Sequence, residues 1–265
     1  MGSTPTSPTT LQLQSFMGRI SRKKINQDFF KIWSPQMSYI LGYIVADGCI
    51  YKRKNRKNSY TLNITSKDKD NLLKMGRSLS SGCSISIKYN SQRMPYSQIQ
   101  ISNREICEDL ISLGVSSKKN YNSDFLKVPK KFFSDFTRGF FDGDGTVYIY
   151  KVNGTPQIKA GFVSPNLSFI TEFNKQLCEA IGIQCKAVHK FHSKNKKVPL
   201  YNICFYIDDC ERLYKFMYKN ASIFLNRKHR VFKKWENVKL KNRRYYIKQN
   251  YPSKVGWHLN QKVLV

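Results

Sequence analysis

Short runs of alternating apolar and polar residues recur along the chain, separated by longer segments in which apolar residues follow helical spacing. In residues 60–65, Tyr60, Leu62 and Ile64 alternate with polar residues, which predicts a strand with one apolar face. Residues 67–79 place apolar side chains at helical intervals and predict a helix. The same patterns predict further strands at 49–52, 84–89 and 96–101, and a helix at 103–113 that Gly114 ends.

The second half of the chain repeats this order of elements. Strands are expected at 146–151, 157–163, 184–191 and 200–207, helices at 166–181 and 208–218, and one further helix at 227–235. With a helix at the start of each half, both halves have the order α-β-β-α-β-β-α. We therefore expect an α+β fold of two pseudo-symmetric repeats with antiparallel sheets. The repeats span residues 31–122 and 123–238, between a disordered leader with a basic arm (1–30) and a basic aromatic tail (239–265).

The helix that opens each half ends in the same short pattern. Residues 38–49 read SYILGYIVADGC, and residues 134–146 read SDFTRGFFDGDGT. A serine and a proline at positions 34 and 35 are typical of a helix start, with a capping side chain and a proline in the first turn. When Asp47 is aligned with Asp144, 97 residues later (144 − 47), three pairs of small residues coincide: Gly42 with Gly139, Ala46 with Gly143, and Gly48 with Gly145.

These pairs predict a close contact between two helices that ends at two carboxylates. Small residues four apart share one helix face, so the two backbones can approach closely. We expect Gly48 and Gly145 to adopt the left-handed conformation that ends many helices. Asp47 and Asp144 would then lie side by side and repel each other unless a divalent cation neutralises them. Oxygen ligands of this kind suit Mg²⁺, which binds through one or two carboxylates and substrate phosphates.

ILGYIVADG (residues 40–48) and TRGFFDGDG (residues 137–145) resemble the two signature motifs of LAGLIDADG homing endonucleases in their single-chain, two-repeat form. The resemblance extends over residues 30–235. Val45 departs from the pattern, because the motif has its first aspartate there, whereas Asp142 keeps it. In this family that position does not bind the metal. The resemblance implies that the two sheets form a saddle on duplex DNA, with the motif helices at their interface above the minor groove.

The resemblance also implies an activity, a cofactor and a partner. Asp47 and Asp144 would bind Mg²⁺, with Mn²⁺ as a substitute and Ca²⁺ supporting binding without cleavage. One chain, acting as a monomer, would cut one phosphodiester on each strand of a long double-stranded DNA site, leaving staggered ends. Such cleavage promotes homing of the enzyme's own coding intron or element. The enzyme would act on DNA inside a cell, in a bacterial cytoplasm or an organelle matrix, which the sequence does not distinguish.

Four further residues match positions that the family uses near the scissile phosphates. A basic residue follows the last helix of each repeat, and Lys119 and Lys228 fit this position, with Lys118 and Arg227 as neighbouring alternatives. A lysine there would stabilise charge on the phosphate or help to activate water. Ser66 and Ser164 stand at the strand end where the family often has a polar residue that positions water. The alternative for each of the four is an ordinary structural or surface role.

The charge of the chain narrows the choice of partner. Lys and Arg number 46 against 17 Asp and Glu, which gives a formal net charge of +29. Nucleic acid is the natural partner for such an excess, through phosphate neutralisation and counterion release. An anionic membrane surface is the competing explanation. No apolar stretch reaches the ~18 residues that a membrane span needs.

Polar residues on the outer faces of the two expected sheets are candidates for reading DNA. Alternate strand positions place amide, hydroxyl and amino groups on the face opposite the apolar one. A two-stranded ribbon fits the major groove, where such groups distinguish base pairs, while Lys and Arg at the strand ends hold phosphates. The candidate base contacts are Asn63, Gln98, Gln100, Lys159, Asn202 and Tyr206.

The cysteines and histidines predict neither a disulfide framework nor a zinc site. Seven cysteines form an odd set without a Cys-x-x-Cys pair, which is typical of reduced thiols in an intracellular protein. His189 and His192 lie in a lysine-rich segment without zinc-binding spacing. The tail from Lys239 interleaves basic and aromatic residues. We expect it to contact flanking phosphates, with a short packed appendage as the alternative.

Three other functions belong to the same scaffold. A maturase that assists RNA splicing shares it, and the two aspartates and two lysines favour cleavage without excluding this second role. A DNA-binding regulator that does not cleave would lack the acidic pair and carry a separate helix-turn-helix domain. A nuclease borne by an intein would be flanked by splicing segments with a terminal His-Asn, which we do not find.

Overall fold

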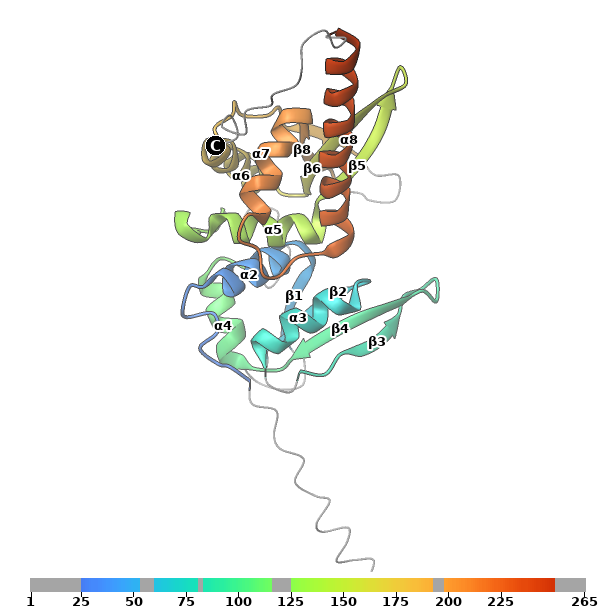
Figure 1. The fold of residues 1–265 in the computed structure, drawn as a ribbon. Helices are drawn as coiled ribbons and strands as arrows, with labels where there is room; N and C mark the ends of the chain where they lie inside the picture. The colour runs from blue at the N-terminus through green and yellow to red at the C-terminus, as the bar shows by residue number, and fades with distance from the viewer. Residues whose placement is uncertain (1–24, 53–59, 81–82, 116–124, 193–197, 251–265) are drawn as a thin grey trace, which may run out of the picture.

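The two halves of the chain form two lobes that meet along a pair of helices (Figure 1). The computed structural model describes residues 25–52, 60–80, 83–115, 125–192 and 198–250, with the backbone only for residues 241–250. Between the lobes lie α2 (Pro35–Asp47) and α5 (Phe133–Asp144), each the first helix of its half. The remaining elements are arranged on either side of this pair.

The first lobe contains an antiparallel sheet whose strands pair in the order β1-β2-β4-β3. Its inner face is apolar, because Leu62 pairs with Ile101 and Ile64 with Ile99, and all four side chains are buried. After α2, the lobe consists of β1 (Gly48–Lys52), β2 (Tyr60–Ser66), α3 (Lys69–Leu79), β3 (Ser86–Tyr89), β4 (Pro95–Ile101) and α4 (Arg104–Ser112).

The second lobe repeats the first with the equivalent strand order, β5-β6-β8-β7. Its inner face pairs Ala160 with Phe205 and Phe162 with Ile203, again all buried. The two matching sheets confirm the predicted α+β fold of two repeats. After α5, the lobe consists of β5 (Thr146–Val152), β6 (Thr155–Ser164), α6 (Leu167–Ile181), β7 (His189–Phe191), β8 (Leu200–Tyr206), α7 (Ile207–Tyr218) and α8 (Asn226–Asn250).

The helices begin and end where the local sequence favours it. Ser34 accepts a hydrogen bond from the backbone N–H of Met37 at the start of α2, as the Ser-Pro pair predicts. Asn103 and Asn166 cap α4 and α6 in the same way. Gly114 after α4 has a φ of +100°, a conformation that favours glycine and stops the helix.

One hydrophobic core runs through both lobes, but the two lobes fill it differently. The first lobe uses mainly aliphatic side chains such as Leu72 and Met75. The second uses phenylalanine, and the ring centroids of Phe140, Phe162 and Phe173 lie 4.9 to 5.7 Å apart. The repeats therefore share an architecture without sharing the packing inside it.

The strand expected at residues 184–191 is wrong in its first part, because β7 covers only His189–Phe191. The side chain of Asn174 on α6 explains the difference. Its amide donates to the carbonyl of Lys186 over 2.7 Å and accepts from the N–H of the same residue. The backbone that would have paired in the sheet is thus bound to a helix.

The last helix is much longer than the expected 227–235. It runs through Asn250 and crosses the expected boundary between residues 238 and 239 without a break. Residues 226–250 contain neither glycine nor proline, so nothing in the local sequence ends the helix earlier. None of the helices in the described part of the chain has both the length and the hydropathy that a membrane span requires.

The second motif helix, α5, begins at Phe133, after a 3₁₀ turn at Lys130–Phe132 that follows Pro129. Of the expected leader and basic arm (1–30), residues 1–24 lie outside the described residues, as do residues 116–124 between the two repeats.

Candidate active site

The contact between α2 and α5 depends on glycine, as the paired motifs predict. A Cβ atom added to Gly42 would overlap the backbone oxygen of Phe136, and one added to Gly139 would overlap the backbone oxygen of Tyr39. One turn further on, Gly143 lies against the methyl group of Ala46. The backbones of the two helices therefore touch directly, which two larger side chains would prevent.

The expected left-handed conformation of Gly48 and Gly145 is wrong. Both residues are extended, with φ and ψ of −83° and 158° for Gly48 and −73° and 157° for Gly145. The chain turns straight from each helix into its first strand, so no left-handed residue is needed. Glycine is required for space, because a Cβ at Gly48 would crowd Ile44 and one at Gly145 would crowd Phe141.

Asp47 and Asp144 are the last residues of α2 and α5, at the place where these helices meet. The Oδ2 atom of Asp47 lies 3.5 Å from the position that a Cβ on Gly143 would occupy, directly before Asp144 in the chain. The charges of both aspartates act on the ammonium group of Lys228. The structure thus brings the two predicted carboxylates to one location.

These carboxylates fit a divalent cation that takes oxygen ligands. Within the described residues no group of three or more His, Cys, Asp or Glu side chains could hold a metal alone. Mg²⁺ commonly binds through one or two carboxylates and completes its shell with substrate phosphates and water. The donor set of Asp47 and Asp144 matches that pattern and does not match a zinc site.

Lys228, in the first turn of α8, contacts the end of α5. Its ammonium group donates to the backbone carbonyls of Phe141, Asp142 and Gly143 over 2.6, 2.9 and 3.2 Å. Burial lowers the pKa of Lys228 to about 8, although the negative charges nearby, Asp142 foremost, oppose this shift. The family resemblance implies that Lys228 lies close to the scissile phosphates. In the structure Lys228 lies beside Asp47 and Asp144.

Asp142 lies at the position where the first motif has Val45, and its carboxylate is buried. It accepts hydrogen bonds from the hydroxyl of Tyr39 over 2.9 Å and from the N–H of Leu225 over 2.7 Å. Burial raises the pKa of Asp142 to about 6, and these hydrogen bonds hold it below the value that burial alone would give. Asp142 therefore joins α2, α5 and the residue that precedes α8.

Ser66 and Ser164 occupy equivalent places at the ends of β2 and β6. The hydroxyl of Ser66 accepts from the N–H of Asp68 over 3.0 Å, and that of Ser164 accepts from the N–H of Asn166 over 3.1 Å. Both serines therefore shape the turn between strand and helix. Ser66 also accepts from the hydroxyl of Tyr43 over 3.0 Å. The predicted roles of both serines stay predictions, and Lys119 and Lys118 lie outside the described residues.

A cavity of about 560 Å³ opens beside Asp47. An ion pair between Asp68 and Arg227, with 3.0 Å between Oδ2 and Nε, links the two repeats at its edge. Its other lining residues come from α2, from the end of β2, from the β3–β4 turn and from α5: Tyr43, Asp47, Thr65, Ser66, Lys67, Asn90, Met94, Pro95, Tyr96, Asp142 and Gly143.

The candidate base contacts share the outer faces of the two sheets. In the first sheet Asn63 pairs with Gln100, and Gln98 lies two pairs further along, opposite Thr65. In the second sheet Lys159 pairs with Tyr206, whose ring centroid lies 5.3 Å from the ammonium group, and Asn202 lies on the same face.

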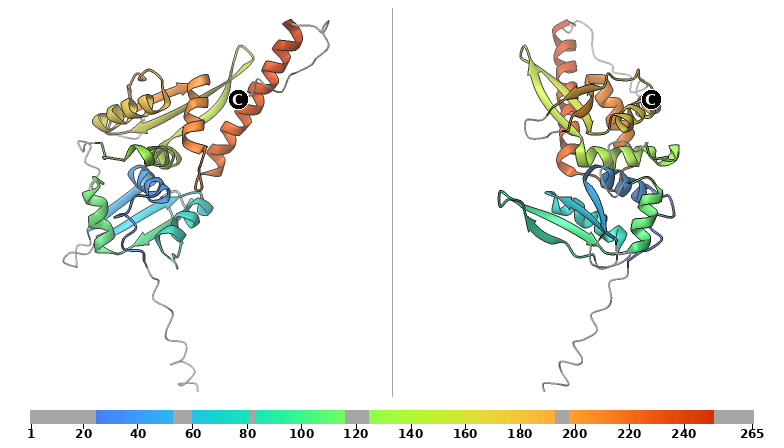
Figure 2. Two further views of the ribbon diagram at one scale, coloured as in Figure 1. Left: turned by 60° about the vertical axis from the view of Figure 1, so that its left-hand side comes forward. Right: turned by 180° about the vertical axis from the view of Figure 1, so that it is seen from behind.

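The hairpins β3–β4 and β5–β6 project to the same side of the molecule in Figure 1 and in the right-hand view of Figure 2. Asn63 and Asn202 each have a buried side-chain oxygen without a hydrogen-bond partner in the described structure. Of the candidate base contacts, Gln100 and Tyr206 have exposed side chains.

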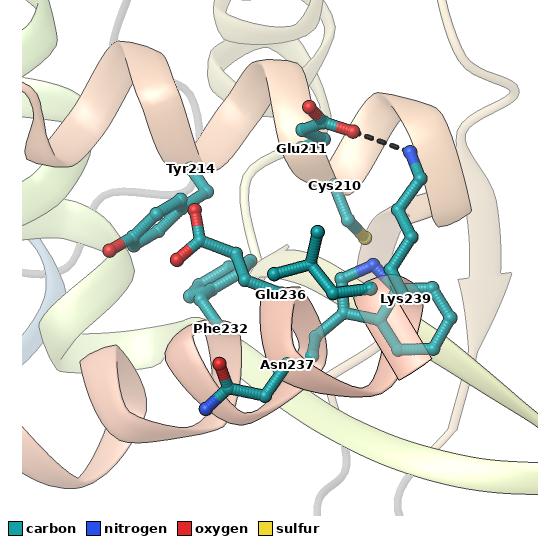
Figure 3. A pocket seen from close by; sticks show the side chains of 9 residues that line it. Cys210, Glu211, Tyr214, Phe232, Glu236, Asn237 and Lys239 are labelled. Atoms are coloured by element: carbon teal, nitrogen blue, oxygen red, sulfur yellow. Dashed lines mark hydrogen bonds and ion pairs between the residues drawn. The ribbon is translucent and has the colours of Figure 1, made fainter. Parts of the chain in front are cut away.

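A second cavity, of about 440 Å³, lies between α7 and α8 (Figure 3). Lys239 closes one side of it by donating to Glu211 over 2.6 Å and to Asp208 over 3.3 Å. Lys239, expected to start a DNA-contacting tail, belongs instead to α8 and packs on α7. Residues 251–265 of that tail lie outside the described residues.

Sequence reasoning missed the polar contacts that attach α5 to the chain before α8. The guanidinium of Arg138 donates to the carbonyls of Ile223 and Met217 over 2.8 and 2.7 Å and to Asp135 over 2.6 Å. Arg138 is almost fully buried. A charged residue inside an apolar motif helix is a signal for such a buried contact, although it does not identify the partner.

Residues 34–113 match the family described as the LAGLIDADG-like domain. This range contains α2 to α4, the first repeat. Protein MJ0398 of Methanocaldococcus jannaschii is 34% identical over 126 residues. The match covers 45% of this chain and 42% of that protein, so the chain spans less than half of the length of this relative.

The fold is similar to that of two solved structures. The LAGLIDADG homing endonuclease I-GzeII in complex with a DNA target is 13% identical, with a TM-score of 0.52 over 83% of this chain and 94% of that chain. The LAGLIDADG meganuclease I-AabMI bound to uncleaved DNA is 14% identical, with a TM-score of 0.50 over 82% and 95%. Identities this low show the fold alone.

The two sheets, with glycine-packed helices between them, define a two-repeat protein of the LAGLIDADG fold. Its first repeat matches the LAGLIDADG-like domain family, and the resemblance carried by the paired motifs is confirmed.

Proposed function

We propose that this protein is a site-specific endonuclease of double-stranded DNA that depends on a divalent metal ion. The observation that carries the proposal is the meeting of two helix ends, each with an aspartate, between two sheets that each extend a hairpin to the same side of the molecule (Figure 1). Asp47 and Asp144 come from one chain, so a monomer suffices. The similar folds of I-GzeII and I-AabMI, both solved with DNA, support DNA as the partner.

DNA binding would use the charge and the sheets together. A net charge of +29 supplies phosphate contacts and a strong dependence on salt. The amide group of Gln100 and the ammonium group of Lys159 stand on strands that fit the major groove, where they can contact base edges, whereas the amide of Gln98 is buried. The sequence of a long target would thus be read by the strands, while the motif helices face the minor groove.

Cleavage would occur where α2 and α5 end. Asp47 and Asp144 would hold Mg²⁺, which stabilises the attacking and leaving oxygens of an in-line displacement when bound. Ser66 accepts two hydrogen bonds and retains its own hydroxyl hydrogen, which it can donate to a water molecule. That water oxygen would bond to phosphorus and lose a proton to solvent, while the bond from phosphorus to the departing sugar oxygen breaks and this oxygen takes up a proton from solvent. One such event on each strand gives staggered ends.

The biological outcome would be homing of the coding intron or element, with the protein acting on DNA inside the cell. We propose Mg²⁺ as the cofactor, Mn²⁺ as a substitute and Ca²⁺ as an ion that supports binding without cleavage.

The test is a selection for cleaved molecules from a randomised duplex library in Mg²⁺. We expect the parent protein to yield one long consensus, cut on both strands with staggered ends. The double variant Asp47→Asn, Asp144→Asn should bind that consensus in Ca²⁺ but leave it intact. The matched control is Asp28→Asn, Asp208→Asn, which makes the same charge change at the surface and should cut normally.

Two outcomes would overturn the proposal. If the parent binds duplex DNA and leaves it intact with every divalent ion tried, the protein is a binding protein or a maturase on the same fold. If the Asp47→Asn, Asp144→Asn variant cuts as the parent does, the catalytic metal lies elsewhere.

A further inference from the structure

Arg227 and Lys228 are neighbours in the chain, yet their surroundings are opposite. Lys228 is 5% exposed, and three backbone carbonyls of α5 surround its ammonium group. The side chain of Arg227 is 60% exposed and lines the cavity beside Asp47. Only one of the two cations therefore faces the space in which DNA would lie.

Lys228 has no donor left for a ligand. An ammonium group has three N–H donors, and the carbonyls of Phe141, Asp142 and Gly143 accept three hydrogen bonds from it. The ring of Phe141, with its centroid at 5.3 Å, packs against the same group. These carbonyls form the negative end of the α5 dipole, next to Asp144. Lys228 thus neutralises the helix end from which that aspartate projects.

Arg227 has the properties that Lys228 lacks. Its guanidinium carries five N–H donors in a planar fork that suits phosphate. It projects from the first turn of α8, a 25-residue helix, whose N-terminal N–H groups also favour an anion. Its ion pair with Asp68 engages Nε at the edge of the cavity that Asp47 and Ser66 line.

The carboxylate of Asp68 pairs with Arg227 and does not cap the helix that it precedes. Asp68 stands at the N-cap of α3, but its side chain makes no capping hydrogen bond. At the equivalent place in the second repeat, Asn166 caps α6 through the N–H of Phe169 over 3.0 Å. Aspartate is as good a cap as asparagine. The carboxylate of Asp68 is therefore directed to Arg227 and would regain the cap once Arg227 moved away.

We propose that Arg227, and not Lys228, is the cation of α8 that binds a DNA phosphate beside Asp47, exchanging its contact with Asp68 for the phosphate, while Lys228 is a positioning residue for the end of α5. This inference rests on the proposed function for its substrate. The Asp68 carboxylate keeps Arg227 at the edge of the cavity until the phosphate arrives.

The test compares Arg227→Gln with Arg104→Gln. Arg104 is a matched control, because it is also an exposed arginine in an ion pair, with Glu108. Binding to duplex DNA is measured in Ca²⁺ over a range of salt, and the cleavage rate in Mg²⁺ at saturating protein. We expect Arg227→Gln to reduce the slope of log affinity against log salt by about 0.9 and the rate by about 100-fold. Arg104→Gln should change neither rate nor slope appreciably.

Two further variants separate positioning from phosphate binding. Asp68→Asn should tighten binding several-fold, because Arg227 no longer has a competing partner. Lys228→Met should keep the salt slope of the parent and require more Mg²⁺ for half-maximal rate, because the end of α5 is no longer held. A salt slope reduced by Lys228→Met and kept by Arg227→Gln would reverse the assignment.

The outcome for Arg227 is separable from the outcome for the nuclease proposal. If the parent does not cleave but Arg227→Gln still reduces the salt slope, the phosphate contact stands and cleavage is wrong. If the parent cleaves and Arg227→Gln matches Arg104→Gln in both measurements, the inference about Arg227 fails and the nuclease proposal survives.

Discussion

The hydroxyl of Tyr39 donates a hydrogen bond of 2.9 Å to the carboxylate of Asp142, and this contact connects the first helix of one repeat to the first helix of the other. Both side chains are almost completely buried. The contact between α2 and α5 therefore combines this buried hydrogen bond with direct contact between the two backbones at Gly42 and Gly139. Two of the following predictions test these two features.

The carboxylate of Asp142 makes stability depend on pH. Burial raises its pKa from 3.8 to about 6, so the protonated form is favoured on folding. The stabilisation that protonated Asp142 gives to the folded state is complete below pH 3.8 and is lost as the pH rises through about 6. Relative to Asp142→Asn, the free energy of unfolding should fall by about 2.5 kcal/mol between pH 4 and 7. Denaturant unfolding in EDTA measures this difference, and a difference that rises with pH contradicts the assignment.

Gly139 should tolerate no side chain. In Gly139→Ala the new methyl group meets the backbone of Tyr39, so α2 and α5 must separate, at a cost of about 2–4 kcal/mol in the free energy of unfolding. Gly154→Ala is the control, because Gly154 has a φ of +79° but no atoms near an added Cβ. Gly154→Ala should lower the free energy of unfolding by only about 1–2 kcal/mol. Equal losses for the two variants would show that the close approach of α2 and α5 adds no cost at Gly139.

Removing the ammonium group of Lys228 should destabilise the protein. Lys228→Met keeps the aliphatic part of the side chain but removes the ammonium donor from the carbonyls of Phe141, Asp142 and Gly143, which should lower the free energy of unfolding by about 2–4 kcal/mol. The control is Lys233→Met on the same helix, whose exposed ion pair with Glu236 should contribute less than about 1 kcal/mol. Thermal unfolding of both variants decides the matter, and a Lys228→Met protein as stable as the parent would contradict the described contacts.

Sequence patterns predicted the repeat and its centre because the responsible signals are local. Ser34 and Pro35 start α2, and the small residues at Gly42 and Gly139 are placed by helical spacing alone. The buried ends of Lys228 and Arg138 could not be predicted in this way. Their partners are backbone carbonyls 79 to 87 positions away in the chain, and only the folded chain brings them together.

The two glycines that follow the motif helices, and the last helix, show a related limit of prediction from sequence. Gly48 and Gly145 were correctly singled out, but for backbone freedom, whereas the structure requires them for space against Ile44 and Phe141. The length of α8 was underestimated because apolar periodicity fades after Trp235, although no residue there breaks a helix. A pattern of buried faces indicates where a helix packs, and it does not show where the helix ends.

The outer faces of the sheets should determine the preferred DNA sequence without affecting stability. Lys159→Ala should relax the preference at one or two base pairs in one half of the target by about 1–3 kcal/mol, and Gln100→Ala should do so in the other half. Selection of bound duplexes in Ca²⁺ measures both effects. Lys215→Ala, an exposed lysine on α7, is the control and should leave the preference unchanged. Identical preferences for the Lys159→Ala protein and the parent would remove Lys159 from the reading face.

The contact between Tyr39 and Asp142 occurs only once, because Val45 occupies the place of Asp142 in the first repeat. Two copies of the second repeat would bury two carboxylates that lack this hydroxyl, and two copies of the first would leave it without an acceptor. Neither repeat can therefore replace the other at the shared helix pair. A protein whose halves cannot be interchanged has no reason to prefer a palindrome, and its recognition sequence is expected to consist of two unrelated half-sites in a fixed orientation.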